Sequence, residues 1–212
     1  MAAIYPEGTL LTGGLSKDRS SGGYRLGAVI LPEECPEELS FGLEKIAATI
    51  YTNVTTPVQY AAVQAYTASS EMDEYLQVTR SIHALIGQKL SERFARIPGL
   101  KVTEPKGGFY FLADFNQLGE TMQKKGIGCA NELSKTLIAH PHHIAVVTGD
   151  SLVVKPDNYC ARIAFVDYDG PAAYDDYRQN PPANEQEKEG FFTKHAARML
   201  RGAEALEKFL NS

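Results

Sequence analysis

The chain has few cysteines, no long apolar run and no concentration of positive charge. Its 212 residues include only three cysteines, none of them in a C-x-x-C spacing: Cys35, Cys129 and Cys160. This spacing argues against a disulfide framework and a thiolate zinc site, so we expect reduced, buried thiols and no metal. No run of eighteen apolar residues occurs, which argues against a membrane-spanning helix. The first residues, MAAIYPEGTLL, lack the basic start and apolar stretch of a secretory signal, so the expected location is the cytoplasm.

The charge balance favours a small molecule as the partner. The formal net charge is −5, and no basic stripe with interleaved aromatic residues is present, so nucleic acid is not an expected partner. Hydrophobic residues make up 43% of the chain, which is typical of a globular protein. A chain of 212 residues can bury a core as one large domain or two small ones.

The spacing of apolar residues predicts strands that alternate with helices. Strands are expected at 9–12, which should be buried, and at 26–31, 100–103, 108–115, 143–147 and 160–166. Helices are expected at 36–51, 58–66, 70–97 and 130–139, with one more at the end of the chain, over residues 192–210. The S-x-x-D pattern at Ser70 predicts a capping box for the longest helix, and the polar run 167–190 predicts an exposed excursion. The expected class is therefore α/β or α+β.

The segment most informative about chemistry runs from Thr12 to Gly27, with the sequence TGGLSKDRSSGGYRLG. Lys17 follows a predicted strand among small residues, which leaves room around its amine for a bulky adduct, and the glycines let backbone N–H groups approach an anion. Arg25 is close enough along the chain to curl back to the same anion. A phosphorylated aldehyde requires such an amine and such an arginine, although a surface loop with two solvated cations has the same spacing.

The string G-L-S-K-x5-G-Y/W-R-L-G in this segment resembles the cofactor-lysine motif of the class I/II aminotransferases, the fold-type I enzymes that use pyridoxal 5′-phosphate. The resemblance implies that Lys17 binds the cofactor covalently and moves the proton at the substrate carbon. It implies also that Ser16 and Arg25 bind the cofactor, with Arg25 on its phosphate. Gly14 stands where the family often has a serine or threonine that binds the phosphate.

Three later segments are similar to the same family. Residues 53–62 resemble the loop and helix at the dimer interface, and residues 105–110 resemble the turn that opens the sheet of the small domain. Residues 148–152 and 161–165 resemble a turn and the R-I/L-A/S-F/Y strand, with Thr148 in place of the usual proline.

Arg162 lies in the apolar run 161–166, where an unpaired guanidinium is costly, so we expect a carboxylate partner. That partner is either an internal acid, Asp114 or Asp167, or a ligand. The family resemblance implies that Arg162 binds the α-carboxylate of the substrate.

The resemblance implies a PLP-transferase-like fold with two parts. Residues 1–70 are expected to form the end of the large cofactor domain, and residues 71–212 the small C-terminal domain. Family members are about twice this long, so the N-terminal half of the cofactor domain is expected to be absent and the chain alone to be a poor catalyst.

Two functions follow from this sequence. The first is the C-terminal portion of an aminotransferase that exchanges an amino group between an amino acid and a 2-oxo acid, acting as a homodimer or with a complementing N-terminal segment. The alternative is a non-catalytic module for dimerisation or partner binding. The histidines in residues 140–143 (His-Pro-His-His) are interpreted as a solvated helix end rather than a metal site.

Overall fold

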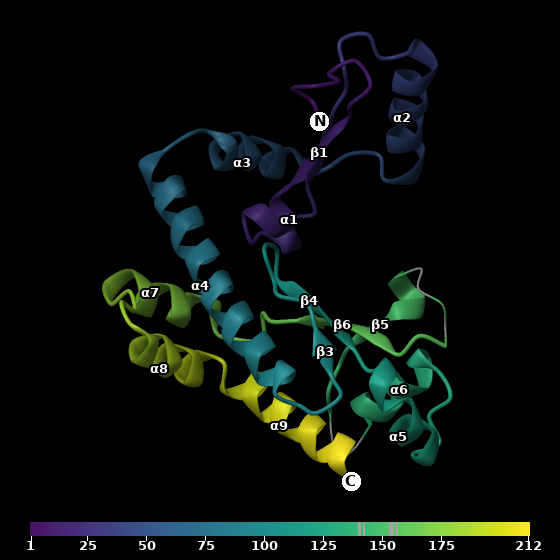
Figure 1. Cartoon of the computed structure of the whole chain (residues 1–212). Coiled ribbons are helices and arrows are strands. Elements are labelled where there is room, and N and C mark those ends of the chain that lie inside the picture. Colours follow the sequence, from purple (N-terminus) through teal and green to yellow (C-terminus); the bar gives the residue numbers. More distant parts are fainter. Residues whose placement is uncertain (140, 142, 153–154, 156) are drawn as a thin grey trace. The chain divides into compact units, whose positions relative to one another are not determined.

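The computed structural model describes residues 1–212 with the exception of residues 140, 142, 153, 154 and 156 (Figure 1). It divides into two compact units, the N-terminal unit Met1–Leu76 and the C-terminal unit Gln77–Ser212. The roles predicted for residues 1–70 and 71–212, in the cofactor domain and the small domain, stay predictions.

The N-terminal unit is built around a two-stranded antiparallel ribbon. Strand β1 (Leu11–Gly14) pairs with β2 (Gly27–Ile30), and Gly14 lies opposite Gly27. The other elements of this unit are α1 (Leu15–Asp18), the 3₁₀ turn η1 (Gly22–Tyr24), α2 (Glu37–Ile50), α3 (Thr56–Tyr66) and the start of α4 (Ser70–Ala95). The predicted strands on either side of a glycine-rich loop are confirmed. The burial predicted for the strand at 9–12 is wrong, because the ribbon has only two strands and leaves Leu10 and Leu11 exposed.

The C-terminal unit has a four-stranded antiparallel sheet in the order β3-β4-β6-β5. Its strands are β3 (Lys101–Val102), β4 (Tyr110–Asp114), β5 (Val147–Thr148) and β6 (Cys160–Ala164). Its helices after α4 are α5 (Gly119–Lys124), α6 (Ala130–Ile138), α7 (Gly170–Gln179), α8 (Glu185–His195) and α9 (Ala197–Asn211), with 3₁₀ turns η2 (Asn116–Leu118) and η3 (Gly149–Leu152). Successive residues of a strand point to opposite faces, and the core lies against the face that carries Phe111, Ala113, Ala161 and Ile163.

The predicted long helix is confirmed as α4. Its buried face carries Ile82, Ile86, Leu90 and Phe94, in the predicted helical spacing. The predicted cap is displaced by one residue, because the Met72 backbone N–H donates to Oγ of Ser69 (3.2 Å), not of Ser70.

The expected exposed excursion at 167–190 is wrong, because this segment contains α7 and the start of α8. Each helix begins at a polar side chain that accepts a backbone N–H: Asp169 accepts from Ala172, and Asn184 from Glu187. The predicted terminal helix is in fact two helices, α8 and α9.

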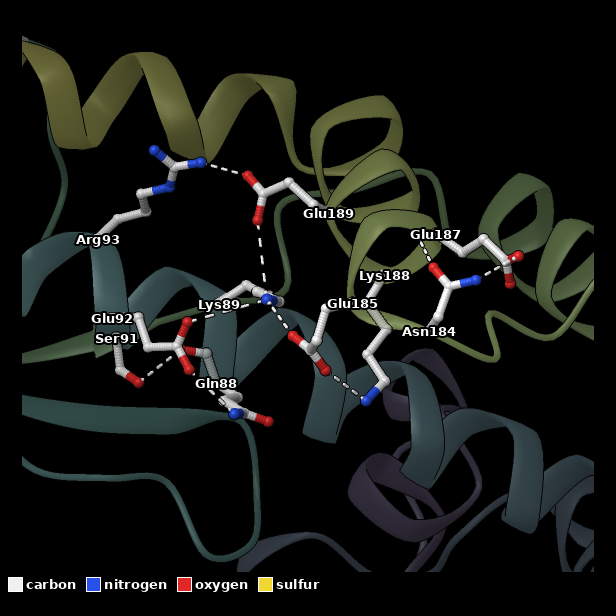
Figure 2. Close-up of polar contacts among 10 residues, drawn as sticks. All are labelled: Gln88, Lys89, Ser91, Glu92, Arg93, Asn184, Glu185, Glu187, Lys188 and Glu189. Carbon is white, nitrogen blue, oxygen red and sulfur yellow. Dashed lines mark hydrogen bonds and ion pairs between the residues drawn. The ribbon is translucent and has the colours of Figure 1, made fainter.

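Ion pairs join α4 to α8 within the C-terminal unit (Figure 2). Lys89 on α4 contacts Glu185 (2.8 Å) and Glu189 (3.8 Å) on α8, and Arg93 also pairs with Glu189. Lys188 contacts Glu185 from within α8 (2.7 Å). Hydrogen bonds from Lys188 and Lys89 lower the pKa of Glu185 from its ordinary value of 4.5 to about 2.

This lowered pKa predicts an acid-sensitive contribution to stability. Because the carboxyl is more acidic in the folded chain, its contribution is complete above pH 4.5 and is lost as the pH falls to about 2. We expect Glu185→Gln to lower the urea midpoint slightly near neutrality and to match the wild type near pH 2. Glu207→Gln, which changes an exposed carboxylate on α9, is the control; an equal effect of both variants at every pH would contradict the prediction.

Gly87 on α4 packs against the ring of Phe165, the residue that follows β6. A Cβ built there would lie 2.7 Å from Cζ of Phe165, well inside contact distance. Gly87→Ala should therefore cost about 1–3 kcal/mol by overpacking, partly offset by up to about 1 kcal/mol of helix propensity. Gly202→Ala on α9 meets nothing within 4 Å and should be neutral or stabilising. Chemical denaturation of both variants checks the prediction, which a stabilised Gly87→Ala chain would refute.

Candidate functional site

Lys17 lies in a short helical turn that directly follows β1. Leu15 is the buried residue of this turn, and its backbone joins both sides of the loop: its N–H donates to Leu26 (3.2 Å) and its carbonyl accepts from Ser21 (2.9 Å). Ser16 is half-buried and Lys17 is exposed. The loop therefore presents the lysine at the end of the ribbon, as the sequence predicted.

Gly14 has a steric reason to lack a side chain. A Cβ at this position would lie 3.2 Å from the carbonyl oxygen of Leu26, which is tighter than an ordinary contact. A serine or threonine here would therefore crowd the backbone of the paired segment.

Arg25 turns back toward the glycine-rich loop, and its approach to an anion shared with Lys17 stays a prediction. Its backbone adopts the left-handed conformation (φ 54°), and its Nη1 donates to the carbonyl of Gly22 (2.9 Å). Arg25 lines a hollow of about 740 Å³ together with residues of β1, β2 and the loop before α3, among them Thr12, Asn53 and Thr55. Lys17 and Ser16 do not belong to this lining, so the structure brings Arg25 to the hollow and leaves the lysine outside it.

Arg19 ties the lysine turn to the end of α3, a contact that sequence reasoning missed. Its Nε donates to the carbonyl of Ala65 (2.9 Å), and its guanidinium carbon lies 4.9 Å from the ring centroid of Tyr66. Partial burial, and then the carboxylate of Asp18, raises the pKa of Tyr66. Arg19 and Ala65 are 46 positions apart, so no local pattern could have identified this contact.

Arg162 lies on β6, where β4 and β5 flank it: Leu112 pairs with it on one side and Val147 on the other. Its neighbours Ala161 and Ile163 face the core, so its side chain stands on the opposite face of the sheet. The Nε atom is buried and has no hydrogen-bond partner among the described residues.

The internal acids expected as partners of Arg162 are bonded elsewhere. Asp167 pairs with Arg198 (2.9 Å), and Asp114 accepts from the backbone and side chain of Asn116. The interpretation of Arg162 as half of an internal ion pair with either acid is therefore wrong. Binding of its guanidinium to a ligand stays a prediction.

The three cysteines are free thiols and partly exposed, so their predicted burial is wrong. Within the described part of the chain, no three histidine, cysteine, aspartate or glutamate side chains gather to hold a metal ion; His140 and His142 lie outside the described residues. None of the helices described has the length and apolar character needed to cross a membrane.

Comparisons with known proteins agree on one family. Residues 2–169 match the family described as aminotransferase class I and II. An aspartate aminotransferase of Bacillus sp. (strain YM-2) is 31% identical over 142 residues, which are 66% of this chain and 33% of that protein. An asparagine–oxo-acid transaminase of Streptococcus mutans is 28% identical over 141 residues, 66% of this chain and 33% of that protein.

Solved structures share the fold. An aminotransferase from Escherichia coli superposes with a TM-score of 0.67 at 16% identity, over 96% of this chain and 42% of that one. An aspartate aminotransferase from Thermus thermophilus with maleate has a TM-score of 0.65 at 19% identity, over 96% of this chain and 43% of that one. The chain spans about a third of the length of the curated relatives it matches.

Proposed function

The chain belongs to the aminotransferase class I and II family, and from this premise we propose that it forms part of an enzyme that transfers an amino group between an amino acid and a 2-oxo acid. The observation that carries the proposal is the loop between β1 and β2, which holds Lys17 and Arg25 in one connected turn with the family's motif. Relatives named for aspartate and for asparagine share an α-amino carboxylate as substrate, and this class is the one proposed here.

The donor groups of the loop fit pyridoxal 5′-phosphate. When bound, this cofactor supplies an aldehyde for an amine and a ring that withdraws electrons from the substrate carbon. Lys17 would hold it through its amine, and Ser16 and Arg25 through the phosphate, since a hydroxyl and a guanidinium are strong phosphate ligands. The hollow lined by Arg25 supports the assignment of this arginine, because it leaves space beside a cation for an anionic group.

Two side chains would act on the substrate. Once the substrate amine has taken its place on the cofactor, the amine of Lys17 would take the proton from the substrate α-carbon and deliver it to the cofactor. Arg162 binds the α-carboxylate with two parallel N–H donors and so orients the α-carbon. The buried Nε of Arg162, unpaired among the described residues, supports this role, since a carboxylate would satisfy it.

The proposal is tested by adding pyridoxal 5′-phosphate and then an amino acid to the full 212-residue chain and measuring the 2-oxo acid released. We expect a visible absorption band on cofactor addition and only slow release of 2-oxo acid, because the chain is proposed to be one part of the enzyme. A band without 2-oxo acid would limit this chain to holding the cofactor. The absence of both would refute the proposal.

A second candidate function, partner binding, is favoured by the exposed apolar side chains of the N-terminal unit. In residues 1–76, all of which the structure describes, only Leu15 and Ala62 are buried apolar residues. Phe41, Ile46 and Ile50 on α2 are each more than half exposed. We propose that a second copy of the chain covers this surface. Sedimentation should give a dimer that Phe41→Ser weakens; a monomer at all concentrations would refute it.

A further inference from the structure

We propose that Tyr110 is a positioning residue that holds the guanidinium of Arg162 ready for the substrate carboxylate. This inference rests on the proposed function of Arg162 as the carboxylate ligand and goes beyond it, because it names what keeps in place an arginine whose Nε has no partner among the described residues. The guanidinium carbon lies 4.3 Å from the centroid of the Tyr110 ring, which is close contact for a cation over an aromatic face.

The pairing of β4 with β6 produces this contact (Figure 1). Tyr110 lies opposite Ala164, and Arg162 lies opposite Leu112, so tyrosine and arginine are diagonal neighbours on the same face of the sheet. Diagonal neighbours in an antiparallel pair are within reach of aromatic and long side chains. Ala164 is small, and this leaves the space beside Arg162 open to the ring.

Among the described residues, the other neighbours of Arg162 do not bond its guanidinium. The cross-strand neighbours Leu112 and Val147 are aliphatic, so their side chains offer no hydrogen-bond acceptor. The acids Asp114 and Asp167 are bonded elsewhere. The aromatic ring of Tyr110 is thus the contact that restrains the arginine, and Phe109 in turn braces that ring, with centroids 4.3 Å apart.

Stacking on the ring orders the guanidinium before a carboxylate binds to it. The ring covers one flat side of the group and not its edge, so the stack does not occupy the N–H donors, which lie in the plane and can form two parallel hydrogen bonds with a carboxylate. Because the side chain is already ordered, less rotamer entropy is lost when the ligand binds. Tyr110 therefore raises the affinity for the carboxylate without touching it.

The test is nuclear magnetic resonance of the full chain, with pyruvate as the carboxylate probe. The Nε–H signal of Arg162, assigned by its loss in Arg162→Lys, should be displaced by the ring current of Tyr110. Tyr110→Phe keeps the ring and should preserve both the displaced signal and the affinity for pyruvate. Tyr110→Leu should remove the displacement and weaken pyruvate binding about fivefold. The backbone amide spectrum of each variant verifies that it is folded.

The outcomes distinguish the role of Tyr110 as a positioning residue from the role of Arg162 as the carboxylate site. Equal Nε–H signals and equal pyruvate affinities in wild type and Tyr110→Leu would refute the role of Tyr110 and leave Arg162 as the carboxylate site. If pyruvate moves no Arg162 signal even in the wild type, the carboxylate site itself is refuted, and the role of Tyr110 with it. Loss of affinity in Tyr110→Phe as well would assign the effect to the hydroxyl and overturn the stacking argument.

Discussion

Lys17→Ala is expected to abolish covalent attachment of pyridoxal 5′-phosphate and to lower amino-group transfer by roughly 10²–10⁴-fold through the loss of proton transfer alone. The amine is the group that both holds the aldehyde and moves the proton, and methyl replaces it without disturbing the buried Leu15 beside it. Because Lys17 is exposed, its removal should leave the stability of the chain almost unchanged.

Borohydride reduction followed by peptide mapping measures the attachment directly. In the wild type the label should be found on Lys17, and in Lys17→Ala the visible absorption band should be missing. Lys45→Ala is the matched control, since Lys45 is also an exposed lysine of the N-terminal unit. Labelling spread over several lysines in the wild type, or an undiminished band in Lys17→Ala, would show that Lys17 is not the specific attachment site of the cofactor.

The parts of the site that are local in sequence could be predicted. Lys17 and Arg25 lie on one loop, and the two glycine pairs around them predict a break between two strands. The face occupied by Arg162 follows from the two-residue alternation of β6, because Ala161 and Ile163 have to face the core. Helix α4 was predictable for the same kind of reason, a repeated apolar spacing sustained over many turns.

Contacts between distant segments could not be predicted. The stack of Tyr110 on Arg162 depends on the register of β4 against β6, which places Leu112 and not another residue opposite the arginine. The hydrogen bond from Arg19 to the carbonyl of Ala65, at the end of α3, likewise joins segments that are far apart in the sequence.

The prediction for residues 167–190 was wrong because the polar composition of this segment is also typical of an exposed loop. Asp169 and Asn184 cap the helices locally, whereas Glu185 and Glu189 form ion pairs with α4, a distant segment of the chain. Charge in a sequence does not distinguish a solvated loop from a helix whose polar face is paired.

Phe165→Ala is expected to be the most destabilising single change in the C-terminal unit. Phe165 is 1% exposed, stacks on Phe111 with ring centroids 6.3 Å apart, and fills the space left by Gly87 on α4. Its backbone N–H donates to the carbonyl of Phe109 (3.1 Å), so this side chain lies where β6 leaves the sheet. Its removal leaves a cavity between helix and sheet and should cost about 3–5 kcal/mol.

Such a loss is a large share of the 5–15 kcal/mol that stabilises a typical domain, so Tm should fall by about 10–20 °C. Differential scanning calorimetry measures this change. Val166→Ala removes the next side chain, which is 41% exposed, and should change stability by less than about 0.5 kcal/mol. Because Arg162 and Tyr110 depend on the pairing of β4 with β6, Phe165→Ala should also erase the ring-current displacement of the Arg162 signal at temperatures where Val166→Ala retains it. If Phe165→Ala lowered Tm no more than Val166→Ala does, the contact between α4 and the sheet would not be what maintains the arginine's position.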